Sequence, residues 1–303
     1  METNVRAKGP KAFIAKICAV LFLLIMIVFT LYPIVYTVLG SLKTNAELTA
    51  GGSFLPKSWQ FQNYYQAFIQ ADFVKYTGNS VILAVSTTLL AVITCALAGF
   101  IFARRDFTGK KLLLGLYTSM MFISLGSVTL YPIYQFLHDV GLSKSMIGLI
   151  LALTGGQAMN VLLVMGFVKG IPKELDEAAT IDGCSWDGIF TRIILPMCTP
   201  ILATVGIFSA VNQWNSFQDT LIYMTDSKLY SLQYLLYTYI NQASALANAA
   251  KANSANVAAL ASAATPTSIR MTVSVIVVLP IMFTYPFFQR FFVKGMMLGA
   301  VKG

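Results

Sequence analysis

The residue types that could relay protons or ions lie away from the long apolar stretches of this 303-residue chain. All 12 Asp and Glu residues fall outside the six apolar stretches named below, and the single histidine, His138, is expected at the outer end of one of them. Ion-coupled pumps usually keep a carboxylate or a histidine inside the membrane as a relay. Proton coupling is therefore disfavoured, whereas sodium coupling through carbonyl and hydroxyl groups stays open.

Enzyme chemistry and nucleotide binding have no support in the sequence either. It contains no HExxH or GxSxG motif, so no catalytic residue and no metal ligand is assigned. The 4 cysteines are dispersed without a CxxC pair, which favours packing roles: Cys18, Cys95, Cys184 and Cys198. A GxxxxGK[ST] phosphate loop is also absent, because Gly109-Lys110-Lys111 lacks the upstream Gly and the following Ser or Thr. No cofactor is expected in this chain, and energy from ATP would have to enter through a partner.

One polar connection, residues 169–194, has the pattern of a helix–turn–helix. Pro172 suits a first helical turn. Three acidic residues follow where the helix dipole favours anions: Glu174, Asp176 and Glu177. Gly183 is expected to end this helix. A second amphipathic stretch follows, and Pro196 is expected to open the next apolar stretch. The alternative is an ordinary interfacial loop.

The composition excludes a soluble globular protein and a disordered one. The chain is 57% hydrophobic and 11% charged, with a mean hydropathy of +0.71, whereas a soluble domain is nearer one quarter charged. Disordered chains are poor in apolar residues. We therefore expect an all-α, polytopic membrane protein.

Six stretches are long and apolar enough to span a bilayer, which takes about 20 residues. They predict one transmembrane domain over residues 1–303, with two long outer segments at 41–72 and 218–269. The spans are expected at 13–39, 74–102, 112–137, 146–168, 195–217 and 270–293. The first is too long for a signal-peptide core and is expected to be retained.

The positions of the basic residues predict the orientation. The net charge is +9, and most Lys and Arg residues lie in the two tails, the 103–111 loop and the 169–194 segment. Basic residues accumulate on the cytoplasmic side of membrane helices, so both termini are expected there. This reading is favoured over nucleic-acid binding.

The outer segment 218–269 contains an alanine-rich tract, Ala243 to Ala264. Alanine is the best helix former, and Pro266 would end a helix. We therefore expect one or two external helices here, with a flexible linker as the alternative.

Within the polar connection, the chain reads Glu-Ala-Ala at 177–179, Gly after three residues, Ile after nine more, and Leu-Pro after one more. This string resembles the EAA motif of the permease subunits of bacterial ABC importers. In that family the segment is the coupling helix, which docks into a groove of the ATPase subunit. The resemblance implies that the ATPase-coupling residues are Glu177, Ala178, Ala179, Asp182, Gly183, Ile193, Leu195 and Pro196.

Further strings resemble the smaller permease of the maltose-permease type, over nearly the whole chain: Asn79-Ser80, Tyr131-Pro-Ile-Tyr134, Val140-Gly-Leu-Ser143, Trp214-Asn215 and the C-terminal Gln289 to Gly295. The chain departs from that pattern in its larger 218–269 segment. A subgroup of such permeases that imports larger oligosaccharides carries an insert of this kind. The resemblance thus implies an oligosaccharide importer, with a non-sugar solute, a secondary carrier and a membrane enzyme as alternatives.

The resemblance also implies the partners and the location. A second permease, two ATPase subunits that bind ATP and Mg, and an extracellular or periplasmic solute-binding protein would complete the importer in the bacterial cytoplasmic membrane. The two outer segments are candidate docking surfaces for that binding protein. No nucleic acid is expected among the partners.

Polar residues within two spans are candidates for lining the sugar path: Gln157, Asn160, Asn212, Gln213, Trp214 and Asn215. Sugar hydroxyls need hydrogen-bond partners, and an indole ring could stack on a sugar. The alternative is interhelical hydrogen bonding. The Gly155–Gly156 pair would either break the fourth span or allow close packing.

Overall fold

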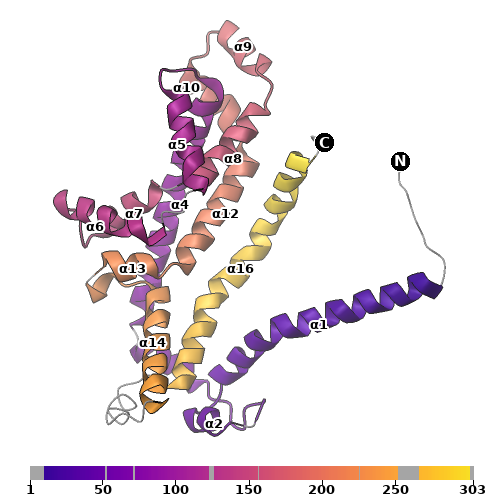
Figure 1. Cartoon of the computed structure of the whole chain (residues 1–303), viewed down its shortest axis with the longest axis vertical. Coiled ribbons are helices and arrows are strands. Elements are labelled where there is room, and N and C mark those ends of the chain that lie inside the picture. Colours follow the sequence, from indigo (N-terminus) through magenta and orange to yellow (C-terminus); the bar gives the residue numbers. More distant parts are fainter. Residues whose placement is uncertain are drawn as a thin grey trace. The chain divides into compact units, whose positions relative to one another are not determined.

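The computed structural model describes residues 10–51, 53–70, 72–122, 126–155, 157–224, 226–251 and 266–300, and every regular element in these ranges is helical (Figure 1). The chain divides into two compact units. One comprises residues 1–71 and 239–277, and the other comprises 72–238 and 278–303.

The first unit contains the long helix α1, Pro10–Ser41, which covers the predicted span 13–39. Its segment Lys16–Ser41 has a hydropathy of 2.8, and none of its most apolar window is buried within the chain. Such a surface is stable only against lipid or another apolar protein surface. The helix therefore has the properties of a membrane span.

The segment 41–72, which is predicted to lie on the outer side, contains two short helices in its described residues: α2, Asn45–Ala50, and α3, Gln62–Gln70. The buried Asn63 amide donates to the backbone oxygens of Ser41 and Lys43, at 2.8 Å each. The Ser41 and Tyr64 hydroxyls form a further hydrogen bond of 2.8 Å. These bonds fasten α3 to the end of α1.

The second unit is built around α4, Phe73–Arg104, which covers the predicted span 74–102. Helices α8, Ala158–Lys169, and α12, Thr199–Asn215, pack along it (Figure 1). Cys95, Val164 and Val205 are fully buried at this junction. The absence of a side chain at Gly99 permits the close approach, since a Cβ there would lie 2.6 Å from Val164 Cγ1.

The predicted fourth span, 146–168, is broken. Helices α7, Met146–Thr154, and α8 meet at 51°. A Cβ at Gly155 would meet only the Ala152 oxygen, at 3.8 Å, so close packing does not explain this glycine. For Gly155 the structure supports the break, and Gly156 lies outside the described residues.

Helix α12 begins at Thr199, later in the chain than the expected start of the fifth span at residue 195. Residues 186–197 form one run, made of α10, Trp186–Ile189, a π-helical turn (η2), Phe190–Ile194, and α11, Leu195–Met197, and it meets α12 at 74°. The break lies at Cys198 instead of Pro196, because Pro200 has no N–H to donate to the Pro196 oxygen. The Thr199 hydroxyl donates to that oxygen instead, at 2.7 Å.

The predicted third span, 112–137, corresponds to several shorter elements: α5, Lys110–Phe122, the 3₁₀ turn η1, Gly126–Thr129, and α6, Leu130–Asp139. Within the described ranges, two helices are long and apolar enough to span a membrane, or four if each bent pair is one span. Helix α16, Thr267–Ala300, covers the predicted span 270–293. The total of six spans stays a prediction.

The segment after α12 forms α13, Gln218–Tyr223, the 3₁₀ turn η3, Ser227–Leu229, and α14, Leu232–Lys251. Helix α14 extends into the alanine-rich tract, so the first part of the tract is helical as expected, and its external side stays a prediction. Residues 252–264 of that tract lie outside the described residues.

Candidate functional sites

The first candidate site is the helix α9, Glu174–Ile181, in the predicted helix–turn–helix. Gly183 adopts a φ of +78°, a conformation that favours glycine. The backbone N–H groups of Gly183 and Cys184 close the helix by donating to the oxygens of Thr180 and Ala179, at 3.0 and 2.9 Å. The predicted helix and its glycine stop are both confirmed.

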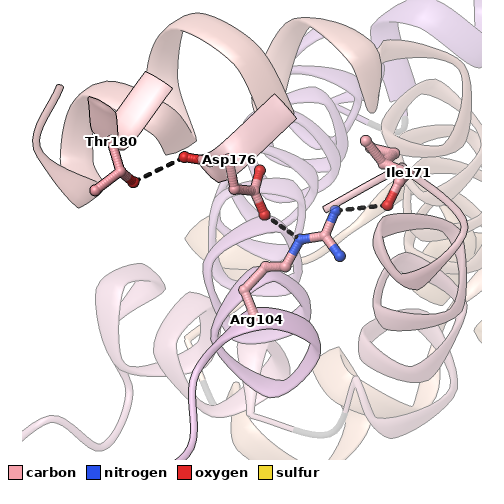
Figure 2. A network of polar contacts seen from close by, with 4 residues as sticks. All are labelled: Arg104, Ile171, Asp176 and Thr180. Carbon is pink, nitrogen blue, oxygen red and sulfur yellow. Dashed lines mark hydrogen bonds and ion pairs between the residues drawn. The ribbon is translucent and has the colours of Figure 1, made fainter. Parts of the chain in front are cut away.

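A buried ion pair holds α9 against α4. Arg104 Nε lies 2.7 Å from Asp176 Oδ2, and the two side chains are only 3% and 8% exposed. Arg104 Nη2 also donates to the Ile171 oxygen, at 2.7 Å, just beyond the end of α8. Figure 2 shows the guanidinium between the two partners. One side chain thus joins the ends of α4 and α8 to the first turn of α9.

Sequence reasoning missed this pair. It took Arg104 as an orientation signal and Asp176 as one of several acids at a helix start. The sequence offers one signal: Asp176 lies three residues before Ala179, and residues at this spacing share a helix face. Both residues are buried in the structure. The identity of its partner, 72 positions earlier (176 − 104), had no local signal.

Aromatic contacts anchor the second half of the helix–turn–helix to the same end of α4. The Phe100 ring lies 5.1 Å from that of Phe190 and 6.5 Å from that of Trp186, between centroids. The Arg105 guanidinium lies 4.4 Å from the centre of the Trp186 ring, within cation–π range.

The opposite side of α9 is open. Ile181 is 86% exposed and Leu175 is 40% exposed. Four of the predicted coupling residues are exposed as well: Glu177, Ala178, Asp182 and Gly183. Ala179 is buried, Ile193 and Leu195 pack partly against the core, and Pro196 is exposed. The predicted set therefore contains an outward-facing surface and an inward-facing anchor.

The second candidate site is a cavity of about 710 Å³ bounded by α4, α7, α8, α12 and α13. Five of the six predicted path residues line it: Gln157, Asn160, Asn212, Gln213 and Asn215. Trp214 does not. It lines a separate hollow of about 300 Å³ with Val81 and Pro280.

The cavity wall combines amide groups with aromatic rings. The described residues give these amides four hydrogen bonds: the Asn160 amide donates to Gln157 Oε1, Gln157 Nε2 donates to the Leu153 oxygen at 3.5 Å, Asn215 Nδ2 donates to the Val211 oxygen at 2.9 Å, and Gln213 Nε2 donates to Asp219 Oδ2 at 3.3 Å. None of these four bonds joins α8 to α12.

The lining residues that sequence reasoning missed include Phe208, Phe217 and Asp219. Phe217 stacks on Tyr237, with centroids 4.2 Å apart, so its ring is held in place. Burial, and then the nearby Asp219 carboxylate, raise the pKa of Tyr223 on α13. The cavity thus carries hydrogen-bonding groups, apolar rings and a negative charge.

No other residue group with a chemical role stands out within the described residues. His138 Nδ1 lies 3.6 Å from Asp139 Oδ1, and both side chains are exposed. The described residues include no cluster of His, Cys, Asp and Glu that could hold a metal ion.

The chain has relatives among known proteins, although no known protein-family profile matches it. It is 34% identical to the LplC protein of Bacillus subtilis over 100% of this chain and 99% of that protein. It is 30% identical to the polygalacturonan/rhamnogalacturonan transport system permease protein YtcP of the same organism, over 93% and 96%. The arabinooligosaccharides transport system permease protein AraQ of Bacillus subtilis is 28% identical over 97% and 99%.

A solved structure has the same fold. A chain of a bacterial ABC transporter involved in the import of the acidic polysaccharide alginate matches with a TM-score of 0.79 and 21% identity, covering 94% of this chain and 98% of that one. Sequence and fold agree over nearly the full length of each protein. The chain therefore belongs to the permease subunits of bacterial carbohydrate ABC importers.

Proposed function

We propose that this chain and a second, homologous permease form the translocation path of an ATP-driven importer for an oligosaccharide. The observation that carries the proposal is that one helix serves both candidate sites. Thr87 of α4 lines the cavity, and Arg104 at the end of α4 holds α9. The two residues are about 25 Å apart along the helix, at 1.5 Å per residue.

The exposed surface of α9 is the proposed docking site for an ATPase subunit. Its exposed apolar residues, Leu175 and Ile181, suit contact with another protein better than contact with water. Two ATPase subunits would bind ATP and Mg, and their closure would push on α9. The ion pair and the Ile171 hydrogen bond would pass that motion to α4 and α8 as rigid-body rocking.

The cavity is the proposed contribution of this chain to the sugar path. Amides donate and accept hydrogen bonds, which matches sugar hydroxyls, and rings such as Phe217 pack on the apolar faces of sugars. The relatives named for arabinooligosaccharides and for polygalacturonan support a carbohydrate fragment as the cargo. Trp214 is not part of this proposed path.

We further propose that residues 1–303 are one transmembrane domain with six spans and both termini in the cytoplasm. The Arg104–Arg105 and Lys110–Lys111 pairs support this orientation, because they cluster in the loop next to α9. The folded outer segment 41–72, with the exposed rings of Trp59 and Phe61, is a proposed docking surface for the solute-binding protein.

The test is sugar-stimulated ATP hydrolysis in proteoliposomes. The chain would be co-expressed with the permease, ATPase and binding protein encoded beside it, and a panel of oligosaccharides would be added. Stimulation by one sugar class, lost when any partner is omitted, supports the proposal. An ATP-hydrolysing complex that ignores every sugar points to another solute, and transport by the chain alone would point to a secondary carrier.

A further inference from the structure

The charge of the cavity wall carries information about the cargo. Asp219 is the one carboxylate among the described lining residues, and these include no Lys, Arg or His. Gln213 Nε2 donates to Asp219 Oδ2, which fixes the carboxylate beside the amide groups of α12. The wall that this chain supplies is therefore negative, with no cation to offset it.

We propose that Asp219 makes this cavity a filter that admits neutral saccharides and disfavours saccharides that carry carboxylates. The inference rests on the proposed function, and it narrows the cargo to a neutral oligosaccharide. It is not transferred from the relatives, since the alginate importer named above handles an acidic polysaccharide. It follows from the chemistry of the wall.

The physical reason is the different response of hydroxyl and carboxylate groups to Asp219. A carboxylate accepts hydrogen bonds from sugar hydroxyls and gains from them. A uronic acid in the same position places a second negative charge within several ångströms of the first. In a partly enclosed, wet cavity this repulsion weakens binding on the order of 10-fold. The amide groups of the wall can donate hydrogen bonds to a uronate, but they carry no positive charge that would neutralise the repulsion.

The experiment compares two probes with the same sugar backbone: an oligogalacturonide, which is charged, and its fully methyl-esterified form, which is neutral and carries one additional methyl group per residue. Equilibrium binding of each would be measured on the complete permease–ATPase complex in nanodiscs, without the binding protein, so that the preference of that protein does not enter. The variants are wild type, Asp219→Asn and a control, Asp139→Asn. Asp139 is exposed on α6 and does not line the cavity, so its variant removes the same charge elsewhere.

Wild type and Asp139→Asn are expected to bind the ester about 10-fold more tightly than the acid. Asp219→Asn is expected to reduce this ratio to about 3-fold or less, chiefly by improved binding of the acid. Raising the salt concentration should also reduce the wild-type ratio, because salt screens charges in a wet cavity.

Two results would overturn the filter. Equal binding of both probes by wild type, or a ratio that Asp219→Asn leaves unchanged, would refute it while the permease function stands. Binding of no probe by any variant, together with absent sugar-stimulated ATP hydrolysis, would refute the saccharide path itself. Thermal melting of each variant would verify that Asp219→Asn leaves the fold intact.

Discussion

Removing one partner of the Arg104–Asp176 pair should destabilise the protein strongly and uncouple it. Asp176→Ala leaves the Arg104 guanidinium buried, with the Ile171 oxygen as its remaining partner. Breaking a buried ion pair from one side costs about 3–5 kcal/mol. The Ile171 bond retains part of the solvation of the charge, so we expect about 3 kcal/mol. The same variant should lower sugar uptake per ATP hydrolysed, because α9 would move without pulling α4.

The assay is unfolding in mixed micelles, with uptake and ATP hydrolysis measured on the folded fraction. Asp106→Ala is the matched control, because the Lys110–Asp106 pair has a similar 2.8 Å distance but Asp106 is 97% exposed. Exposed pairs contribute little, so this variant should behave as wild type. Replacing both buried partners, with Arg104→Met and Asp176→Leu, should restore most of the stability. Equal losses for Asp106→Ala and Asp176→Ala would refute the reasoning.

Three further changes have defined outcomes. Gly183→Asp and Gly109→Asp introduce a side chain at similar positive φ angles, +78° and +89°. Each variant should lower the free energy of unfolding by about 1 kcal/mol, measured by thermal melting. Only Gly183→Asp should abolish uptake. Gly99→Ala should lower the free energy of unfolding by about 1–3 kcal/mol, because its Cβ would lie 2.6 Å from a side chain on α8. Gly206→Ala should not lower the melting temperature, because the nearest side-chain atom would lie 3.5 Å from its Cβ. Trp214→Ala should preserve sugar binding measured by titration, because this side chain lies outside the cavity; a loss of binding in a folded variant would return it to the path.

The helix that resembles the coupling segment and its glycine stop could be predicted because their signals are local. The break at Cys198 was accessible too, since Pro196 and Pro200 are four positions apart, at the spacing of a helical hydrogen bond. Helical periodicity would also have separated Trp214 from the residues that line the cavity. Asn212 and Asn215 share a face at a spacing of three, whereas Trp214 faces the hollow that the cavity does not include.

The Arg104–Asp176 contact could not be predicted in the same way, because no local pattern selects a partner 72 positions away (176 − 104). The same holds for Asp219. Its position after an apolar span indicates only a polar segment, and its charge acquires meaning once α13 places it on the wall of the cavity. Tertiary packing decides both the partner of Asp176 and the position of the Asp219 carboxylate, and both features involve charged side chains.

The bends in the chain bear on how a displacement of α9 would be transmitted to the cavity. Helix α9 contacts α4 through a buried pair and follows directly from α8, whereas its connection to α12 passes through the 74° bend at Cys198. A push on α9 would therefore reach the α4 and α8 walls of the cavity through stiff links, and would reach the α12 wall through a joint with no helical hydrogen bond between Pro196 and residue 200. Unequal links of this kind change the shape of a cavity when one end is displaced, whereas equal links would only move it as a whole.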